Sequence, residues 1–135
     1  MILLTNNAEQ TVQPGEVVTY NVQVMKTGTA ECTLLGTGSV KMRAQGIYSV
    51  SFGANVTGAT AGTPVQLSFR LGGEAIFPGT DMIYTPNVAN AFGNVSKTIP
   101  VSNRCCDFDR ISVANTGTEP IIIGANPSFA IRRVA

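Results

Sequence analysis

The chain has 135 residues, of which 44% are hydrophobic and only 13% charged, and its formal net charge is +1. A chain of this length is expected to form one domain with its own core. A net charge this small indicates no excess of basic residues of the kind that attracts nucleic acid or an anionic membrane. Histidine is absent, which removes the commonest general base and the commonest metal ligand.

The start of the chain predicts an N-terminal arm, residues 1–9, ahead of a single domain at residues 10–135. The segment MILLTNNAEQ has none of the basic residues that open a secretory signal peptide. No window of the sequence approaches 18 consecutive apolar residues, the length that spans a bilayer. We therefore expect neither a signal peptide nor insertion into a membrane.

From residue 17 onwards the apolar residues recur mostly with a period of two, which is typical of half-buried antiparallel strands. The clearest strands are VVTYNVQV (17–24, with Val18, Tyr20, Val22 and Val24 facing inward), GIYSVSFGANV (46–56) and VQLSFRL (65–71). Weaker strands are predicted at 38–43, 95–102, 110–115, 119–123 and 128–134. The segment 82–94 has no clear period and is predicted to be a long loop.

Glycine and proline separate these segments, and no window of ten residues has a helical period free of both. Their positive or preset φ angles suit turns rather than strand interiors. Many short strands joined by turns predict an all-β fold, a β-sandwich or jelly roll, with almost no helix.

Two C-terminal strands are apolar on both faces: PIIIG (120–124) and FAIRRVA (129–135). A strand covered on both sides has this pattern. In one small sandwich the core covers only one face of such a strand. Another subunit would have to cover the other face, which favours an oligomer. The alternative is an ordinary central strand with some exposed isoleucine.

The stretch NRCCDFDR (103–110) is the only one that suggests chemistry at first sight. Asp107 and Asp109, two strand positions apart, would lie about 7 Å from each other, a spacing compatible with an inverting glycosidase. An acid and a base need different environments, however, and these two share one short segment. A solvated or turn-capping role is favoured, with a calcium site as a weaker alternative, and we assign no catalytic, metal-binding or cofactor-binding residue.

The three cysteines, Cys32, Cys105 and Cys106, leave several interpretations open. They are too few and wrongly spaced for a zinc site within one chain, and no histidine is present to activate a thiol. Buried thiols acting as small hydrophobic groups are favoured. A disulfide from Cys32 to Cys105 or Cys106, or a thiol at a subunit interface, is the alternative.

The string GIYSVSFGANVTG resembles the G-x-Y-x-V-x-F strand of the complement globular-head and tumour-necrosis-factor superfamily. The order of the later segments TGATAGTPVQL, LGGEAIFPGT, NVSKTIPV, DRISVANTG and FAIRRVA is similar to the bacterial branch, the C-terminal domains of collagen-like spore-surface glycoproteins. The resemblance covers residues 10–135. It implies a two-sheet jelly roll packed as a homotrimer about a threefold axis, with Phe129, Ile131 and Ile122 as candidate interface residues, and it implies no catalytic residues.

The whole chain also resembles small proteins of phages and prophages of Firmicutes, which carry a similar CCDFDR-I-x-V-x-N-T-G segment and a GANPS segment. This resemblance predicts a non-enzymatic structural protein of a phage particle: a head fibre, a head-decoration protein or another knob on the virion surface. Capsid, portal-proximal or fibre proteins would be its partners. Synthesis would take place in the bacterial cytoplasm, and a bacterial cell or spore surface is the alternative location.

The alternative function is an adhesin or tail-associated receptor-binding module that recognises host-surface or mucosal glycans through loops at 57–63 and 79–94. Aromatic rings can stack on a sugar, and side-chain amides can bond its hydroxyl groups. The candidate contact residues of this kind are Tyr84, Asn87, Asn90, Phe92 and Asn94.

Overall fold

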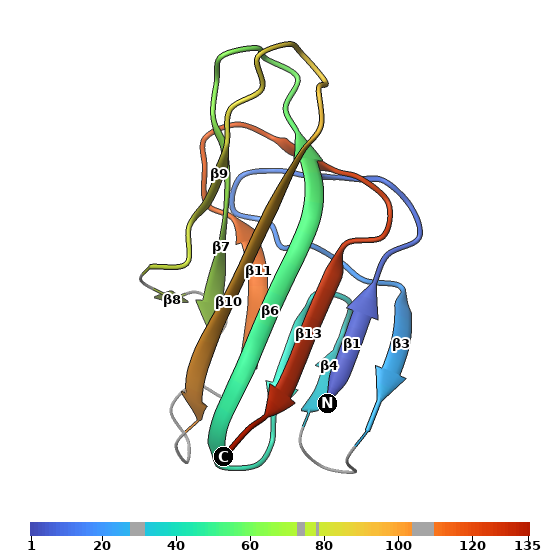
Figure 1. The fold of residues 1–135 in the computed structure, drawn as a ribbon, viewed down its shortest axis with the longest axis vertical. Helices are drawn as coiled ribbons and strands as arrows, with labels where there is room; N and C mark the ends of the chain where they lie inside the picture. Colours follow the sequence, from blue (N-terminus) through green and yellow to red (C-terminus); the bar gives the residue numbers. More distant parts are fainter. Residues whose placement is uncertain (28–31, 73–74, 78, 104–109) are drawn as a thin grey trace.

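The computed structural model describes residues 1–27, 32–72, 75–77, 79–103 and 110–135 (Figure 1). Every described element is a β-strand, and every strand pairing is antiparallel. The described residues include no helix that could span a membrane. The all-β prediction is confirmed.

The strands form two sheets packed face to face. The larger sheet contains β1 (Ile2–Thr5), β2 (Gln10–Val12), β3 (Val22–Lys26), β6 (Gly46–Thr57), β10 (Gly93–Asn103), β12 (Ile121–Ile123) and β13 (Ser128–Arg133). The smaller sheet contains β4 (Cys32–Leu35), β5 (Ser39–Met42), β7 (Val65–Leu71), β8 (Ala75–Ile76), β9 (Met82–Tyr84) and β11 (Arg110–Asn115). Most neighbours within a sheet are not consecutive in the chain, which is the crossover pattern of a jelly roll.

Strand β6 organises the larger sheet. It pairs with β10 along one edge, and with β13 and then β12 along the other. Its alternating sequence buries Tyr48, Val50, Phe52, Ala54 and Val56 in the core, as predicted. Because side chains alternate across a strand, the residues between them lie on the opposite, outer face of the sheet.

The core lies between the two sheets and is centred on Phe129 of β13. Its ring stacks on Tyr20 at a centroid distance of 5.3 Å and contacts Phe52 and Phe69 at 6.3 and 6.4 Å. Phe52 comes from the larger sheet and Phe69 from the smaller one. Aromatic pairs at these distances stabilise a core beyond the area that they bury.

The N-terminal segment differs from the predicted arm. Residues Ile2–Thr5 form β1, which pairs with β13 on one side and β3 on the other. The side chains of Ile2 and Leu4 have no exposed surface. The sequence ILLT is too short to show a period of two, so its pattern did not reveal the strand.

Two other predicted segments also differ from the structure. In 17–24 only the last part belongs to a regular strand, β3; Val18 and Tyr20 are buried as predicted, but Val24 is 55% exposed. The register between β1 and β3 shifts beside Val24, at an irregularity between Leu3 and Leu4. In 82–94, the first residues form β9 and the last begin β10, so the loop is limited to 85–92.

Candidate interaction surfaces

The central part of the outer face of the larger sheet carries almost no charge. We define it by three rows of residues that the strand registers place side by side. These rows are Ser96–Gly53–Ser128, Thr98–Ser51–Ala130–Leu3–Met25 and Pro100–Ser49–Arg132. Arg132 is the single charged residue in the three rows.

This outer face also contains a shallow hollow of about 260 Å³, lined by Met1, Ser49, Ser51, Ala130, Ile131 and Arg132. The small side chains of serine and alanine leave this space over the sheet. The hydroxyls of Ser51 and Thr98 are hydrogen-bonded to each other at 3.0 Å. The hydroxyls of Ser51 and Thr98 therefore have a hydrogen-bond partner within the face itself.

The structure places two of the three predicted interface residues elsewhere. Phe129 and Ile131 have no exposed surface in the single chain, because both side chains point into the core. They therefore offer no surface to another subunit, and the outward residues of β13 are instead Ser128, Ala130 and Arg132. Ile122 is partly exposed but lies at a pocket near one end of the sandwich, not on the outer face defined above.

Two loops, 58–64 and 85–92, form the end of the molecule opposite the chain termini (Figure 1). We call them the apical loops. Backbone hydrogen bonds join them, from the Gly62 N–H to the Pro86 carbonyl at 2.8 Å and from the Asn90 N–H to the Gly58 carbonyl at 3.0 Å. The carbonyl of Ala91 accepts further bonds from the hydroxyls of Thr57 and Tyr84.

The candidate glycan-contact residues lie in or beside loop 85–92, and several of them have structural roles. The Tyr84 ring covers Gly93 so closely that a Cβ there would lie 2.2 Å from Cε1, and its hydroxyl bonds the loop. Asn90 has a positive φ of 63°, a conformation suited to a tight turn. These two residues therefore shape the loop.

The other three candidates are exposed. Phe92 is 49% exposed, and its ring lies over Gly124. The Asn94 amide donates a hydrogen bond to the Asn55 side-chain oxygen at 3.2 Å, whereas Asn87 is exposed within the loop. Phe92 and Asn94 are both linked to Asn55, since the Gly124 N–H beneath the Phe92 ring bonds the Asn55 carbonyl and Asn94 bonds the Asn55 side chain.

A pocket of about 230 Å³ lies beside loop 58–64, and we call it the apical pocket. Residues from three segments of the chain line it: Thr11, Gln13, Gly58, Ala59, Thr60, Thr63, Val65, Glu119, Pro120 and Ile122. The sequence segments TGATAGTP and NTGTEP showed only turn signals, so periodicity could not reveal that they meet. The antiparallel pairing of β12 with both β2 and β6 brings them together.

The cysteine predictions remain untested. Cys32 is buried, with 2% of its surface exposed, at the start of β4 opposite Met42. Cys105 and Cys106 lie outside the described residues, as do Asp107 and Asp109. Within the described ranges, no group of three or more Asp, Glu, Cys or His side chains is placed to hold a metal ion.

Comparison of the sequence with protein-family models and with curated proteins finds no match. Solved structures do match the fold. The globular domain of zebrafish complement 1qA protein has 14% identity and a TM-score of 0.64, covering 98% of each chain. Eiger TNF from S. frugiperda has 12% identity and a TM-score of 0.75, covering 99% of this chain and 91% of the other.

Murine APRIL at pH 8.0 is similar to the same degree, with 14% identity, a TM-score of 0.63, and coverage of 98% and 97% of the two chains. Identities this low establish the fold and no shared activity. The similarity extends over nearly the whole chain in each case. The chain therefore has the jelly-roll fold of complement globular heads and tumour-necrosis-factor-like proteins.

Proposed function

We propose that this protein is a non-enzymatic, homotrimeric structural module on the surface of a phage particle, such as a head fibre or a head-decoration protein. The observation that carries the proposal is the nearly uncharged outer face of the larger sheet. Seven of the eleven residues in its three rows are serine, threonine, glycine or alanine, and such a face is well suited to close contact with another subunit.

The physical argument for oligomerisation is that burying this face under another subunit costs little free energy. The cores of subunit interfaces are depleted in charged residues, because burying an unpaired charge is expensive. Only Arg132 carries a charge in the three rows, and the Ser51 and Thr98 hydroxyls already satisfy each other. Small side chains also let a neighbouring backbone approach closely.

The trimeric state is supported by the jelly-roll fold and by the resemblance of the sequence to the complement and tumour-necrosis-factor superfamily. A threefold ring uses a head-to-tail interface, in which two different patches of the same subunit meet. The outer face is one of these patches in our proposal.

The position on a phage particle is supported by the resemblance of the CCDFDR and GANPS segments to those of small phage and prophage proteins. The fold is compatible with a surface knob, because the termini and the apical loops lie at opposite ends (Figure 1). A knob attached at the terminal end would present loops 58–64 and 85–92 outward. Three copies of one weak contact in a trimer would strengthen binding through effective concentration.

Mass spectrometry of gradient-purified particles tests this location. The particles are taken from the bacterium that encodes the chain, and the soluble lysate proteins serve as the control. We expect the protein to co-purify with the major capsid protein at a fixed ratio. Recovery only in the soluble fraction would contradict the proposal.

A receptor-binding role is the second candidate, and the exposed Phe92 beside the Asn94–Asn55 pair favours it. An aromatic ring can stack on the apolar face of a sugar, and side-chain amides can donate to and accept from its hydroxyl groups. A glycan array probed with the folded protein and with a Phe92→Ala variant tests this role. Binding that is lost in the variant would favour it, and no binding by the folded wild type would eliminate it.

A further inference from the structure

The apical pocket has an aliphatic floor and a polar rim. We call its aliphatic lining residues Val65, Pro120 and Ile122 the floor, and its threonine lining residues Thr11, Thr60 and Thr63 the rim. No aromatic ring lines the pocket. Its volume of about 230 Å³ has room for one side chain or one small molecule.

The wall made by loop 58–64 is fixed in place. The Gly62 N–H and the Gly58 carbonyl each bond to loop 85–92, to Pro86 and Asn90 respectively. A Cβ on Gly58 would lie 2.9 Å from the Val65 Cγ1 atom, so the backbone and the floor are in close contact. Loop 58–64 is therefore held by contacts within the protein itself.

The opposite wall is fixed by Asn115, a buried residue that does not itself line the pocket. Its amide donates hydrogen bonds of 2.9 Å to the carbonyls of Val12 and Glu119, and its oxygen accepts one of 3.0 Å from Gly117. Val12 lies between the rim residues Thr11 and Gln13. One side chain thus joins the strand and the turn that border the pocket, and preformed sites of this kind lose little entropy on binding.

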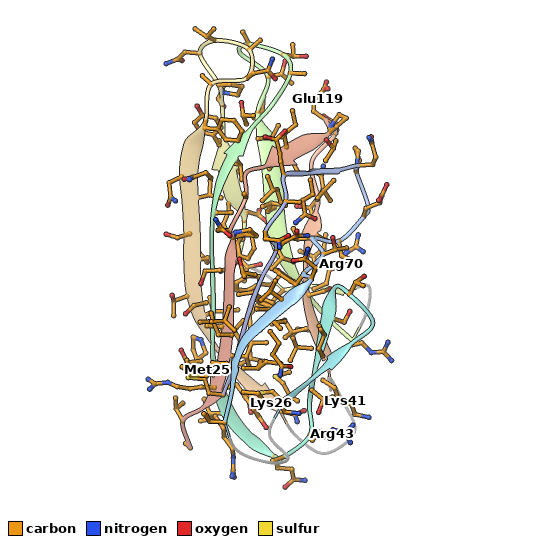
Figure 2. The ribbon with its side chains drawn as sticks, turned by 90° about the vertical axis from the view of Figure 1, so that its right-hand side faces the viewer. Met25, Lys26, Lys41, Arg43, Arg70 and Glu119 are labelled. Atoms are coloured by element: carbon orange, nitrogen blue, oxygen red, sulfur yellow. The ribbon has the colours of Figure 1, made fainter. Side chains whose placement is uncertain are left out.

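Glu119 is the one charged residue that lines the pocket. Its main-chain carbonyl is held by Asn115, but its carboxylate makes no hydrogen bond or ion pair within the part of the chain that the structure describes. Figure 2 shows Glu119 towards the apical end, whereas Lys26, Lys41 and Arg43 lie towards the opposite end. The pocket therefore presents negative charge beside an aliphatic surface.

We propose that the apical pocket binds an aliphatic primary ammonium group, namely the side chain of a lysine on a partner protein. The methylene groups of lysine bury well against aliphatic surface while the ammonium group stays at the rim. There the Glu119 carboxylate and the threonine hydroxyl oxygens accept its three N–H donors. An anionic ligand would be repelled by Glu119, and a sugar would find no aromatic ring to stack on.

The inference is independent of where the protein resides, because it concerns the chemistry of the pocket alone. A single lysine contact of this kind is expected to bind weakly, with a Kd on the order of 1 mM, or about 4 kcal/mol. Three such pockets in one trimer would act together on a partner that repeats the lysine with the same spacing.

The test is an NMR titration of the ¹⁵N-labelled protein with Nα-acetyl-lysine methylamide. We expect saturable shifts confined to loop 58–64 and residues 119–122. The norleucine derivative has a similar stem without the ammonium group and should bind about tenfold more weakly or worse. Methyl glucoside is the third probe, and it should cause no saturable shift at the pocket.

Glu119→Gln should weaken binding of the lysine derivative about tenfold. The matched control Glu9→Gln removes the same charge from an exposed residue outside the pocket and should leave the affinity unchanged. Thr63→Val, which removes a rim hydroxyl while keeping the side-chain shape, is a second variant that should weaken binding.

Three results would overturn the inference. These are no saturable shift with the lysine derivative, equal binding of the norleucine derivative, or pocket shifts produced by methyl glucoside instead. Unchanged binding in a folded Glu119→Gln variant would overturn the role of the carboxylate. None of these outcomes bears on whether the protein is found in particles, so the two proposals can fail separately.

Discussion

Phe129 illustrates how a single residue decides between a core and an interface. In the sequence its strand, FAIRRVA, is apolar on both faces, which makes Phe129 a candidate interface residue. In the structure its ring contacts Tyr20, Phe52 and Phe69 at the centre of the core. The next residue, Ala130, is the apolar residue on the opposite side of the strand, and it lies on the outer face in one row with Leu3 and Met25.

Phe129→Ala should therefore destabilise the single subunit. Truncation of a large core aromatic leaves a cavity, and we expect a loss of about 3–5 kcal/mol in the free energy of unfolding. The half-exposed Phe92→Ala variant is the matched control and should lose only about 1 kcal/mol. Urea unfolding followed by fluorescence measures both values, and equal losses would show that Phe129 is not a core residue.

Tyr20 carries a buried hydroxyl that has no hydrogen-bond partner within the described ranges. Burial raises the pKa of Tyr20 well above 10, because the core does not solvate a phenolate. Above about pH 10 the unfolded state releases this proton while the folded state keeps it. The stability contribution is therefore complete below pH 10 and is lost as the pH rises, by about 1.4 kcal/mol per pH unit.

Tyr20→Phe keeps the stacking on Phe129 and removes both the unpartnered hydroxyl and its titration. At pH 7 we expect the variant to be at least as stable as the wild type, because no hydrogen bond is lost. Above pH 10 it should lose stability less steeply than the wild type. Urea unfolding at a series of pH values from 7 to about 11 measures this, and parallel pH profiles would contradict the account.

At the scale of the element, β1 is the strand that the sequence pattern did not reveal. Four residues, ILLT, give too few alternations to distinguish a strand from an apolar arm. Its place is set by its partners, since it fills the space between β13 and β3. The long strands β6 and β7 were predictable because each repeats the period of two several times.

Leu4→Ala tests the structural role of β1. Leu4 has no exposed surface, so we expect a loss of about 2–5 kcal/mol in the free energy of unfolding. The control is Val24→Ala on the neighbouring strand β3, where the side chain is largely exposed and the loss should be about 0.5 kcal/mol or less. A flexible arm would instead give no measurable loss for Leu4→Ala.

The sequence alone predicts the fold class but not the apical pocket, for a physical reason. Periodicity reports which face of a strand is buried, and this identified the inward residues of β6 and β7. The apical pocket depends on how β12 pairs with β2 and β6, which are far away in sequence. Likewise, Tyr84 could not be recognised as a loop-shaping residue before its contact with Gly93 was visible.

At the scale of the whole molecule, the outer face of the larger sheet and the apical loops are suited to two different kinds of contact. The outer face carries little charge and is suited to contact between subunits. The apical end carries the pocket and the exposed Phe92, and is suited to contact with other molecules. The fold keeps the two regions apart, because the apical loops close one end of the sandwich while the rows of the outer face run across its broad side (Figure 1).

Oligomerisation through the outer face is the central claim, and a charge placed on that face should prevent it. Ser128 and Thr98 are exposed in the single chain, so Ser128→Glu and Thr98→Glu should fold normally. In the trimer, however, each variant would bury three unpaired carboxylates, at a cost of several kcal/mol for each one. Thr118→Glu, at an exposed position outside the three rows, is the matched control.

Sedimentation equilibrium at micromolar concentration tests this claim most directly. The wild type and Thr118→Glu are predicted to sediment at three times the mass of the 14.1 kDa chain. Ser128→Glu and Thr98→Glu are predicted to sediment as folded monomers. A wild-type monomer at this concentration, or trimers that persist in both outer-face variants, would contradict the account.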